Sequence, residues 1–194
     1  MSQLSFFSAE AMPPAITDLS GLLAGPGQAV VSGDRARISV VVDSVPRAEA
    51  VVELVQEAGL SAEVGYSQEG TPLARTEAVV ELRPLVDQWT RGAVKSMPVG
   101  WVPTARALRV WAVAAGRADA DSDRYLLELD PHASDTHQPL ADALIRAGIA
   151  PTLVGARGSC PGLRISGRRR LRRLVENIGE VPKKLDAGTD WPHV

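Results

Sequence analysis

An internal repeat is the feature of this sequence that most constrains its fold. When the 194-residue chain is shifted by 89 residues, its apolar and glycine positions coincide along most of its length. The matching positions are Leu19 and Leu108, Leu22 and Trp111, Gly27 and Gly116, Ile38 and Leu127, Val40 and Leu129, 58–60 and 147–149, Leu85 and Leu174, Val86 and Val175, and Trp89 and Ile178. Because one register holds across so many positions, the pattern indicates a duplicated unit.

Each unit has the same expected order of elements, since alternating apolar residues predict strands and helical spacing predicts helices. In the first unit we expect helix 16–25, strand 37–42, a helix from Pro46 to Gly59, a strand starting at Val64, strand 76–82 and helix 84–93. In the second we expect helix 104–115, strand 124–129, helix 139–147, strands 152–154 and 163–166, and helix 168–178. The expected fold class is α+β, with tandem α-β-α-β-β-α units at 12–95 and 104–180, a linker at 96–103 and a tail at 181–194.

Composition indicates a soluble, cytoplasmic globular protein. Hydrophobic residues make up 45% of the chain and charged residues 23%, which is ordinary for such proteins. The single cysteine, Cys160, forms no internal disulfide and suits a reducing compartment. No apolar run approaches the roughly 18 residues of a membrane span, and the first basic residue is Arg35, so no secretory signal or membrane partner is expected.

Positive charge is concentrated near the C-terminus. The net charge is −2, but segment 164–184 carries eight basic residues against Glu176 and Glu180. That segment is therefore +6 and the rest of the chain −8. Such a patch suits phosphate or an acidic partner, or else is the solvated face of a helix; both interpretations stay open.

The first helix carries a family resemblance. Its sequence Leu19-Ser-Gly-Leu-Leu-Ala-Gly-Pro-Gly27 resembles the signature helix of the LAGLIDADG homing endonucleases, and 108–116 is its degenerate counterpart. The second unit, through Arg-Tyr-Leu-Leu-Glu-Leu-Asp130, is similar to the N-terminal half of WhiA, a sporulation and cell-division transcription regulator. The resemblance covers about residues 16–180. It implies that two antiparallel sheets form a saddle whose solvent side meets DNA.

Small residues in the two signature helices predict that these helices pack side by side between the units. Gly21 and Gly25 lie four residues apart, as do Ala112 and Gly116, and such pairs let two backbones approach closely. Ordinary core helices rich in alanine and glycine are the alternative. That alternative explains each helix singly but not their common offset, so the paired arrangement is favoured.

The resemblance also shows which chemistry is missing. In active homing endonucleases the residue before the terminal glycine is acidic and holds a divalent metal, which phosphodiester hydrolysis requires. Here these positions are Pro26 and Ala115, and the residues two places earlier, Ala24 and Val113, are apolar. We therefore expect no nuclease activity, no catalytic residues, no bound metal and no cofactor.

Other candidate sites are weaker. Four possible metal ligands crowd one loop: Asp130, His132, Asp135 and His137. A polar loop that leads into a helix is the favoured interpretation of this loop. Gly25–Gly27 follows a helix, which argues against a dinucleotide site, and the glycine-rich segment 155–162 is expected to be a hairpin turn. Cys160 has no adjacent base and is expected to be inert.

Two functions from different classes remain. The first is a non-catalytic, nucleic-acid-associated regulator of transcription or cell division. Its candidate DNA-binding residues are Arg37, Arg124, Arg157, Arg164, Arg168, Arg169, Arg170, Arg172 and Arg173. The residues expected on the outer sheet face mix charges, and the glutamates oppose phosphate binding. They are Arg35, Arg37, Ser39, Glu77, Glu81, Arg124, Glu128, Arg157 and Arg164.

The second function is an adaptor that docks a cytosolic protein partner without binding DNA. WhiA carries a C-terminal helix-turn-helix that reads DNA, whereas only a short tail, 183–194, follows the second unit here. This departure weakens the expectation of sequence-specific binding. Exposed tryptophans at Trp89, Trp101 or Trp191 would favour partner docking, because tryptophan is enriched at interface hot spots; rings that cover the core edge would not. No oligomeric state is predicted.

Overall fold

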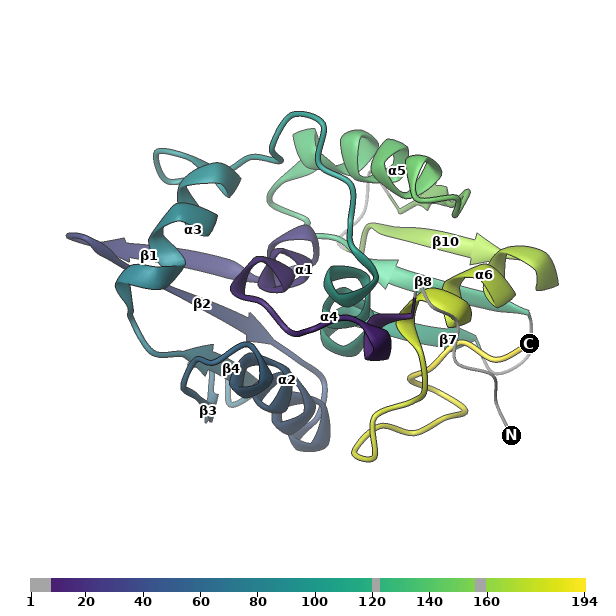
Figure 1. Cartoon of the computed structure of the whole chain (residues 1–194), viewed down its shortest axis with the longest axis horizontal. Coiled ribbons are helices and arrows are strands. Elements are labelled where there is room, and N and C mark those ends of the chain that lie inside the picture. Colours follow the sequence, from purple (N-terminus) through teal and green to yellow (C-terminus); the bar gives the residue numbers. More distant parts are fainter. Residues whose placement is uncertain (1–7, 120–122, 156–159) are drawn as a thin grey trace.

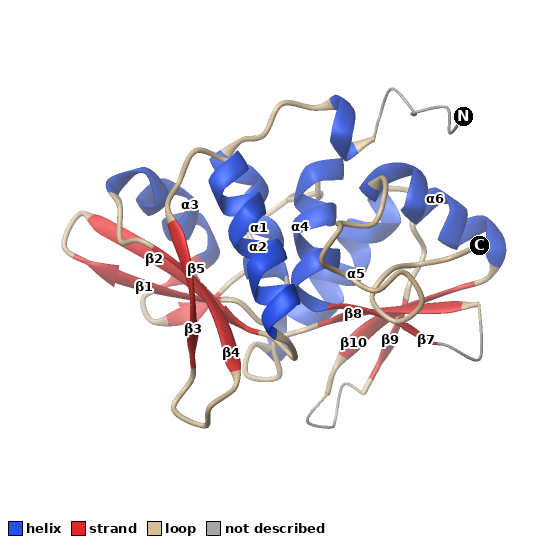
Figure 2. Cartoon of the chain, turned by 90° about the horizontal axis from the view of Figure 1, so that it is seen from below, coloured by secondary structure: helices blue, strands red, loops and turns tan. Residues whose placement is uncertain are grey.

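Two four-stranded antiparallel sheets lie side by side, with helices packed on one side of both (Figures 1 and 2). The computed structural model describes residues 8–119, 123–155 and 160–194. The strand orders are β1-β2-β4-β3 and β7-β8-β10-β9, so the two units have the same sheet topology. The expected α+β class with antiparallel sheets is therefore confirmed. No helix in these described ranges is long and apolar enough to cross a membrane.

The elements of the first unit are α1 (Ser20–Ala24), β1 (Gln28–Ser32), β2 (Arg35–Val41), α2 (Val45–Glu57), β3 (Ala62–Tyr66), β4 (Pro72–Thr76) and α3 (Arg83–Trp89). Those of the second are α4 (Ala105–Ala115), β7 (Gly116–Asp119), β8 (Arg124–Glu128), α5 (His137–Arg146), β9 (Thr152–Val154), β10 (Gly162–Ser166) and α6 (Arg168–Ile178). A short hairpin, β5 (Thr90–Arg91) and β6 (Val94–Lys95), leads from α3 toward the second unit. Single 3₁₀ turns lie at Ala9–Ala11, Ile16–Leu19, Val80–Leu82 and Ser134–Thr136.

Each unit contains one strand more than the sequence pattern predicts. Strands β1 and β7 follow the central helices α1 and α4 directly, so the order within a unit is α-β-β-α-β-β-α. The sequence does not reveal β1 because four of its five residues are exposed, which leaves no alternation of buried and solvated positions.

Two further boundaries in the first unit differ from expectation. The strand predicted at 76–82 is wrong, because β4 ends at Thr76 and residues 80–82 form a 3₁₀ turn. The helix predicted at 84–93 ends at Trp89, where the chain turns into the β5–β6 hairpin. By contrast, the predicted ranges of α4 and α6 agree closely with the structure.

The repeat is exact in β2 and β8 but slips in the strand beside them. Ser39 pairs with Arg75, whereas Glu128, which is Ser39 shifted by 89 residues, pairs with Gly162. Gly162 lies only 87 residues after Arg75. A two-residue difference in the connecting segments therefore accompanies the same sheet topology.

Local sequence signals explain where the helices begin and end. The Ser44 hydroxyl accepts the Arg47 N–H at the start of α2, and Thr104 caps α4 by accepting the Ala107 N–H. Helices α2 and α5 are followed by Gly59 and Gly148 at φ +85° and +81°. Glycine adopts this left-handed conformation without steric cost, so both helices end where the sequence predicts.

The core lies between the sheets and the helical layer. On β2 the predicted face of Ile38, Val40 and Val42 is buried, and on β8 Tyr125 and Leu127 are fully buried. Alternation therefore leaves the opposite face of each sheet uncovered by helices (Figure 2).

The central helices α1 and α4 meet at backbone contact. A Cβ on Gly21 would lie 2.1 Å from the Ala107 carbonyl oxygen and 2.8 Å from the Trp111 nitrogen. A Cβ on Gly25 would lie 3.1 Å from the Trp111 ring, and Ala112 is fully buried. The two units are therefore joined by a contact that only a residue without a side chain permits at position 21.

Gly116 has a different neighbour from the one expected. A Cβ there would overlap the Tyr125 hydroxyl at 1.8 Å, so its small size serves the junction of α4 with β7 and β8 inside the second unit. It does not lie between the two units, because the chain leaves α4 at this residue and turns into β7.

Residues 181–194 fold back onto the second unit. Trp191 is 4% exposed, and its indole N–H donates to the Gly179 carbonyl oxygen at 3.2 Å. The Ala118 N–H of β7 donates to the Thr189 carbonyl oxygen at 2.8 Å, so this segment also covers the edge of the sheet.

We expect Gly21→Ala to lower the free energy of unfolding by about 3 kcal/mol, because the new methyl group would force α1 and α4 apart. Urea denaturation measures this change. Gly65→Ala is the matched control, since a Cβ there meets nothing within 4 Å and the residue has no positive φ. Equal stability of the two variants would contradict close packing of α1 on α4.

Candidate nucleic-acid interface

The candidate interface is the side of both sheets that faces away from the helices. We call it the open sheet face. The strand register places these residues on it: Gln28, Val30, Ser32, Arg35, Arg37, Ser39, Val41, Glu63, Leu73, Arg75, Arg117, Asp119, Arg124, Leu126, Glu128, Thr152, Val154, Gly162, Arg164 and Ser166. In Figure 2 the helices lie above the sheets, and this face points downward.

Most of the sheet residues expected to face outward do lie on the open sheet face. They are Arg35, Arg37, Ser39, Arg124, Glu128 and Arg164. Glu77 and Glu81 do not, because β4 ends before them and Glu81 lies in the following 3₁₀ turn. Arg157 lies outside the residues that the structure describes.

Two arginines of this face, Arg75 and Arg117, were not expected there. Arg75 lies in β4, which the sequence pattern placed four residues too late. Arg117 lies in β7, a four-residue strand whose sequence, Gly-Arg-Ala-Asp, is short and charged. Its only signal is the strict alternation of small and charged residues, which four positions are too few to establish.

Arginines outnumber carboxylates on the open sheet face. Its described strand residues include Arg35, Arg37, Arg75, Arg117, Arg124 and Arg164, against Glu63, Asp119 and Glu128. Two of the arginines are neutralised locally, since Arg75 pairs with Glu63 and Arg117 with Glu128. Arg37, Arg124 and Arg164 form no ion pair with a described residue, so no described side chain neutralises their positive charge.

A chain of ion pairs crosses the middle of the molecule. The Arg47 guanidinium, 2% exposed, bonds Asp43 at 2.9 Å, Asp190 at 2.6 Å and the Val113 carbonyl oxygen at 2.9 Å. It therefore connects α2 with the end of α4 and with the C-terminal segment. These three bonds compensate the burial of the Arg47 charge, because a buried guanidinium without partners would strongly destabilise the fold.

Arg117 extends this chain onto the open sheet face. Its Nε lies 2.6 Å from Glu128, and its second guanidinium nitrogen lies 3.6 Å from Asp43. These residues and Ala115 line a hollow of about 230 Å³ between the two sheets. The two carboxylates of the hollow are thus already engaged by arginine.

This hollow includes one of the positions that holds metal in the homing endonucleases. Ala115 is the last residue of α4, and a Cβ on Gly25, next to Pro26, would lie 3.5 Å from the Ala115 Cβ. Neither Pro26 nor Ala115 offers a side-chain oxygen. Across residues 8–119, 123–155 and 160–194, no group of three or more His, Cys, Asp or Glu side chains is arranged to hold a metal ion. These residues do not fit the divalent metal of an active homologue.

Beside this junction lies a buried ion pair between Lys95 and Asp130. Their charged atoms are 2.8 Å apart, and the side chains are 8% and 4% exposed. The Lys95 ammonium also donates to the Gly25 carbonyl oxygen at 2.9 Å, and the Gln28 amide donates to Asp130 at 2.6 Å. The pair therefore holds β6, β1 and the loop after β8 together.

The ionisation of this pair follows from its burial. Burial raises the pKa of the Asp130 carboxyl, but the hydrogen bond and charge of Lys95, with the His132 N–H and Gln28, outweigh it and lower that pKa. Burial lowers the pKa of Lys95, and the ion pair offsets this only in part. Asp130 is thus committed to Lys95, and the His137 ring lies 2.7 Å from the Asp130 carbonyl oxygen, so this loop is a structural junction.

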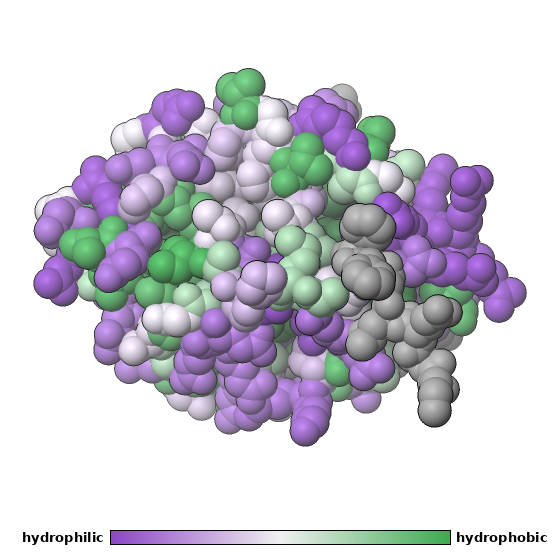
Figure 3. All heavy atoms as spheres, in the orientation of Figure 1, coloured by the Kyte–Doolittle hydropathy of each residue, from purple (hydrophilic) through white to green (hydrophobic). Residues whose placement is uncertain are grey.

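Helix α6 carries a second concentration of arginine, and the end of the molecule where this helix lies is mostly hydrophilic in Figure 3. Leu171, Leu174 and Ile178 are buried, which leaves five exposed arginines in its first two turns: Arg168, Arg169, Arg170, Arg172 and Arg173. Among described residues, only Arg173 has an acidic partner, Glu176 at 3.7 Å. Like charges at helical spacings of three and four destabilise a helix by about 0.2–0.5 kcal/mol per pair, and positive charge at a helix N-terminus also opposes the helix dipole.

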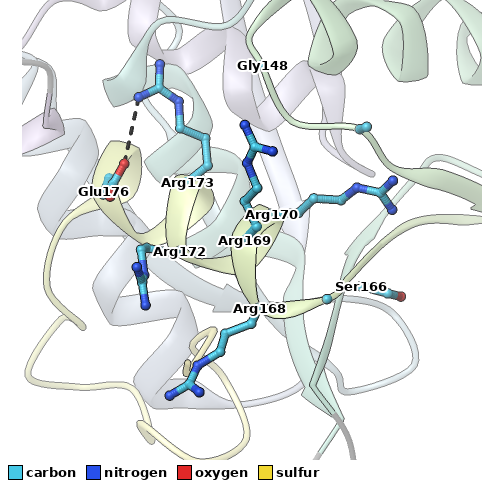
Figure 4. Close-up of a pocket in the computed structure, with 10 residues that line it drawn as sticks. Gly148, Ser166, Arg168, Arg169, Arg170, Arg172, Arg173 and Glu176 are labelled. Atoms are coloured by element: carbon cyan, nitrogen blue, oxygen red, sulfur yellow. Dashed lines mark ion pairs between the residues drawn. The ribbon is translucent and has the colours of Figure 1, made fainter.

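A groove runs beside these arginines. Its volume is about 890 Å³, and Gly148, Ala150, Ser166, Gly167 and one acidic residue, Glu176, complete its lining. In Figure 4, Arg169, Arg170 and Arg173 extend toward the side of Gly148, whereas Arg168 and Arg172 point away from it. Two small residues on the opposite wall leave the guanidinium groups accessible.

The duplicated units, the paired central helices and the two open sheets define a LAGLIDADG-like fold. The sequence matches no protein-family model and no curated protein, but solved structures confirm the fold. Full-length DUF199/WhiA from Thermatoga maritima is 16% identical with a TM-score of 0.62, and the match covers 94% of this chain and 60% of that protein. This chain thus spans 60% of full-length WhiA, which is less than two thirds of that protein.

Two shorter proteins are similar over most of their length. The N-terminal LAGLIDADG domain of DUF199/WhiA is 14% identical with a TM-score of 0.59, and the match covers 93% of each chain. The homing endonuclease I-WcaI, solved bound to its DNA recognition sequence, is 11% identical with a TM-score of 0.58, covering 89% of this chain and 84% of that one. At such identities the likeness establishes the fold alone.

We expect Asp130→Asn to lower the free energy of unfolding at pH 7 by about 3 kcal/mol, because it leaves Lys95 buried without an anion. The folded-state pKa of Asp130 is below the ordinary 3.8, so the carboxylate contributes stability above that pH and loses it as the pH falls through the lowered value. The difference from the parent protein should therefore narrow below about pH 4.

Urea denaturation from pH 7 to pH 3 measures this difference. The control is Asp142→Asn, an exposed carboxylate on α5 whose only hydrogen bond among described residues is to Gln138; we expect a change under about 0.5 kcal/mol. If the free energies of unfolding of Asp130→Asn and the parent protein differ by the same amount from pH 7 to pH 3, the assigned ion pair is contradicted.

Proposed function

We propose that this chain is a non-catalytic, nucleic-acid-associated regulator that holds duplex DNA against the open sheet face. The observation that carries this proposal is the positive charge on that face that no described residue neutralises. Arg37, on the first sheet, and Arg124 and Arg164, on the second, form no ion pair with a described residue. Affinity for DNA comes largely from arginine and lysine contacts to phosphate, and these three residues span both units.

The centre of the face supports a role without chemistry. Hydrolysis of a phosphodiester needs a metal to stabilise charge and activate water. Pro26 and Ala115 replace the acidic ligands, and Arg117 engages the carboxylates of Asp43 and Glu128. Because both carboxylates are paired with an arginine, they are poorly placed to bind a metal ion.

Similarity in fold gives the regulator interpretation its context. The chain resembles the LAGLIDADG domain of WhiA, a transcription regulator, over nearly the full length of both. A related fold in I-WcaI is bound to DNA. We therefore place the DNA of this chain on the open sheet face and the regulated process in transcription or cell division.

The adaptor alternative would be favoured by exposed tryptophan side chains, and the structure does not provide them at Trp89, Trp101 or Trp191. Trp89 and Trp191 are 1% and 4% exposed, and Trp101 packs edge-on against Trp89 with ring centroids 4.9 Å apart. These rings complete the core and offer no exposed hot spot.

Duplex DNA should bind with an affinity that falls steeply with salt. We expect Arg37→Ala with Arg124→Ala to weaken binding at low salt at least tenfold, and to reduce the slope of log affinity against log salt by about 2, since each lost phosphate contact contributes about 0.9. Fluorescence anisotropy between about 50 and 200 mM salt measures both values. Arg83→Ala, which removes an arginine already paired with Asp87, is the control. No binding by the parent protein at the lowest salt would refute the proposal.

The protein should leave DNA intact. We expect supercoiled plasmid to remain uncut with Mg²⁺ or Mn²⁺ present, because positions 26 and 115 provide no metal ligand. Agarose electrophoresis detects nicked and linear forms, and an active homing endonuclease with its own target serves as the positive control. Metal-dependent nicking that persists after Arg117→Ala and through repurification would show that the protein is an enzyme.

A further inference from the structure

The two units differ most in the helix that closes each of them. Helix α3 follows β4 and carries one basic residue, Arg83, which pairs with Asp87 at 2.7 Å. Helix α6 occupies the corresponding place after β10 and carries five arginines in six residues. The duplication therefore has a neutral closing helix on one side and a strongly basic one on the other.

The basic helix begins where the open sheet face ends. Ser166, the last residue of β10, pairs with Arg124 of β8 across the sheet and also lines the groove beside α6. Gly167, at φ +91°, then turns the chain directly into Arg168. In Figure 1, β10 points toward the outer end of the second unit, where α6 starts. Helix α6 lies on the helix-covered side of this sheet, so the positive charge passes from Arg124 and Arg164 on the open sheet face around the outer end of β10 to the helix.

The helix arginines lack local partners that would explain them. Four of the five form no ion pair with a described residue, and Arg173 reaches Glu176 only at 3.7 Å. The arginines repel one another within the helix, as argued above, and Glu176 is the only described carboxylate that pairs with any of them. An external polyanion would relieve this repulsion.

The spacing suits the backbone of a duplex. Residues 168–173 rise by about 7.5 Å along the helix axis, and successive phosphates of one DNA strand lie about 3.4 Å apart along the duplex axis. The groove beside them is lined on its opposite wall by Gly148 and Ala150, which leave room for a phosphate chain. In Figure 4 the guanidinium groups of Arg169, Arg170 and Arg173 lie on the groove side of the helix.

We propose that the groove beside α6 is a second contact site for duplex DNA, one that extends the footprint of the open sheet face past the outer end of the second unit only. This rests on the proposed function and specifies its geometry. The contact is to phosphates and is independent of sequence. A duplex that extends past the outer end of the first unit meets α3 and gains no affinity there.

The test separates the two sites by duplex length. Duplexes from about 10 to about 30 base pairs are titrated in fluorescence anisotropy at several salt concentrations. We expect affinity to rise at least tenfold once the duplex extends past the sheets, beyond the increase from added binding positions, with a salt slope steeper by about 2. The variant Arg169→Gln/Arg170→Gln/Arg173→Gln should lose this rise and keep the affinity for the shortest duplex that binds. Glutamine retains helix propensity, and urea denaturation checks folding.

The variant Arg83→Gln on α3 is the matched control and should behave as the parent protein. If the parent binds short duplexes but gains nothing from length, the α6 site is refuted and the proposed function stands. Loss of affinity by the triple variant equally on short and long duplexes also refutes a separate site. Capture of a second labelled duplex by the protein bound to an immobilised one would show two independent DNA segments and overturn the continuous path. If no duplex binds, the proposed function itself fails.

Discussion

The contact between the backbones of α1 and α4 is the interaction on which the rest of the structure depends. At Gly21 the two helices are so close that a single methyl group would overlap the Ala107 carbonyl oxygen. This proximity places the two sheets edge to edge and sets the width of the surface between them. In most proteins side chains keep the axes of packed helices 8–10 Å apart. The closer approach here restricts which residues position 21 tolerates.

The same proximity determines the chemistry at the base of the helices. In the homing endonucleases the helix ends bring two carboxylates together, and here the same positions bring together a proline turn and an alanine. The adjacent hollow has instead acquired an alternating series of arginine and aspartate or glutamate, in which Arg47 and Arg117 share Asp43. Cations supplied by the chain itself occupy a region where the related enzymes use a bound ion.

How much of this the sequence predicts depends on how residues alternate. Helices α4 and α6 and strand β8 have apolar residues at regular spacing, so their ranges and buried faces could be predicted. Strand β1 could not, because four of its five residues are exposed, and β7 could not, because its alternation extends over only four residues. Arg37, Arg124 and Arg164 were placed on the correct face by alternation. Arg75 and Arg117 were missed together with their strands.

The buried polar residues were also beyond prediction. Arg47 lies on α2 in a sequence that reads as an ordinary amphipathic helix, and an arginine there is expected in solvent. Its three partners are separated from it by four, 66 and 143 residues, and no local pattern reports contacts at such distances. Asp130 was considered as a metal ligand because it stands among histidines, whereas its real partner, Lys95, comes from the hairpin that joins the units.

The fold-back of the last residues has a consequence for where this protein can be shortened. Asp190 is one of the anions around Arg47, its carbonyl oxygen accepts the Tyr125 hydroxyl, and Trp191 lies under the Arg109 guanidinium. Trimming the chain after Lys184 would strip a counterion from the interior and open the edge of β7 at once. Residues 185–194 are thus an integral part of the second unit, whose interior is complete only when they are packed in place.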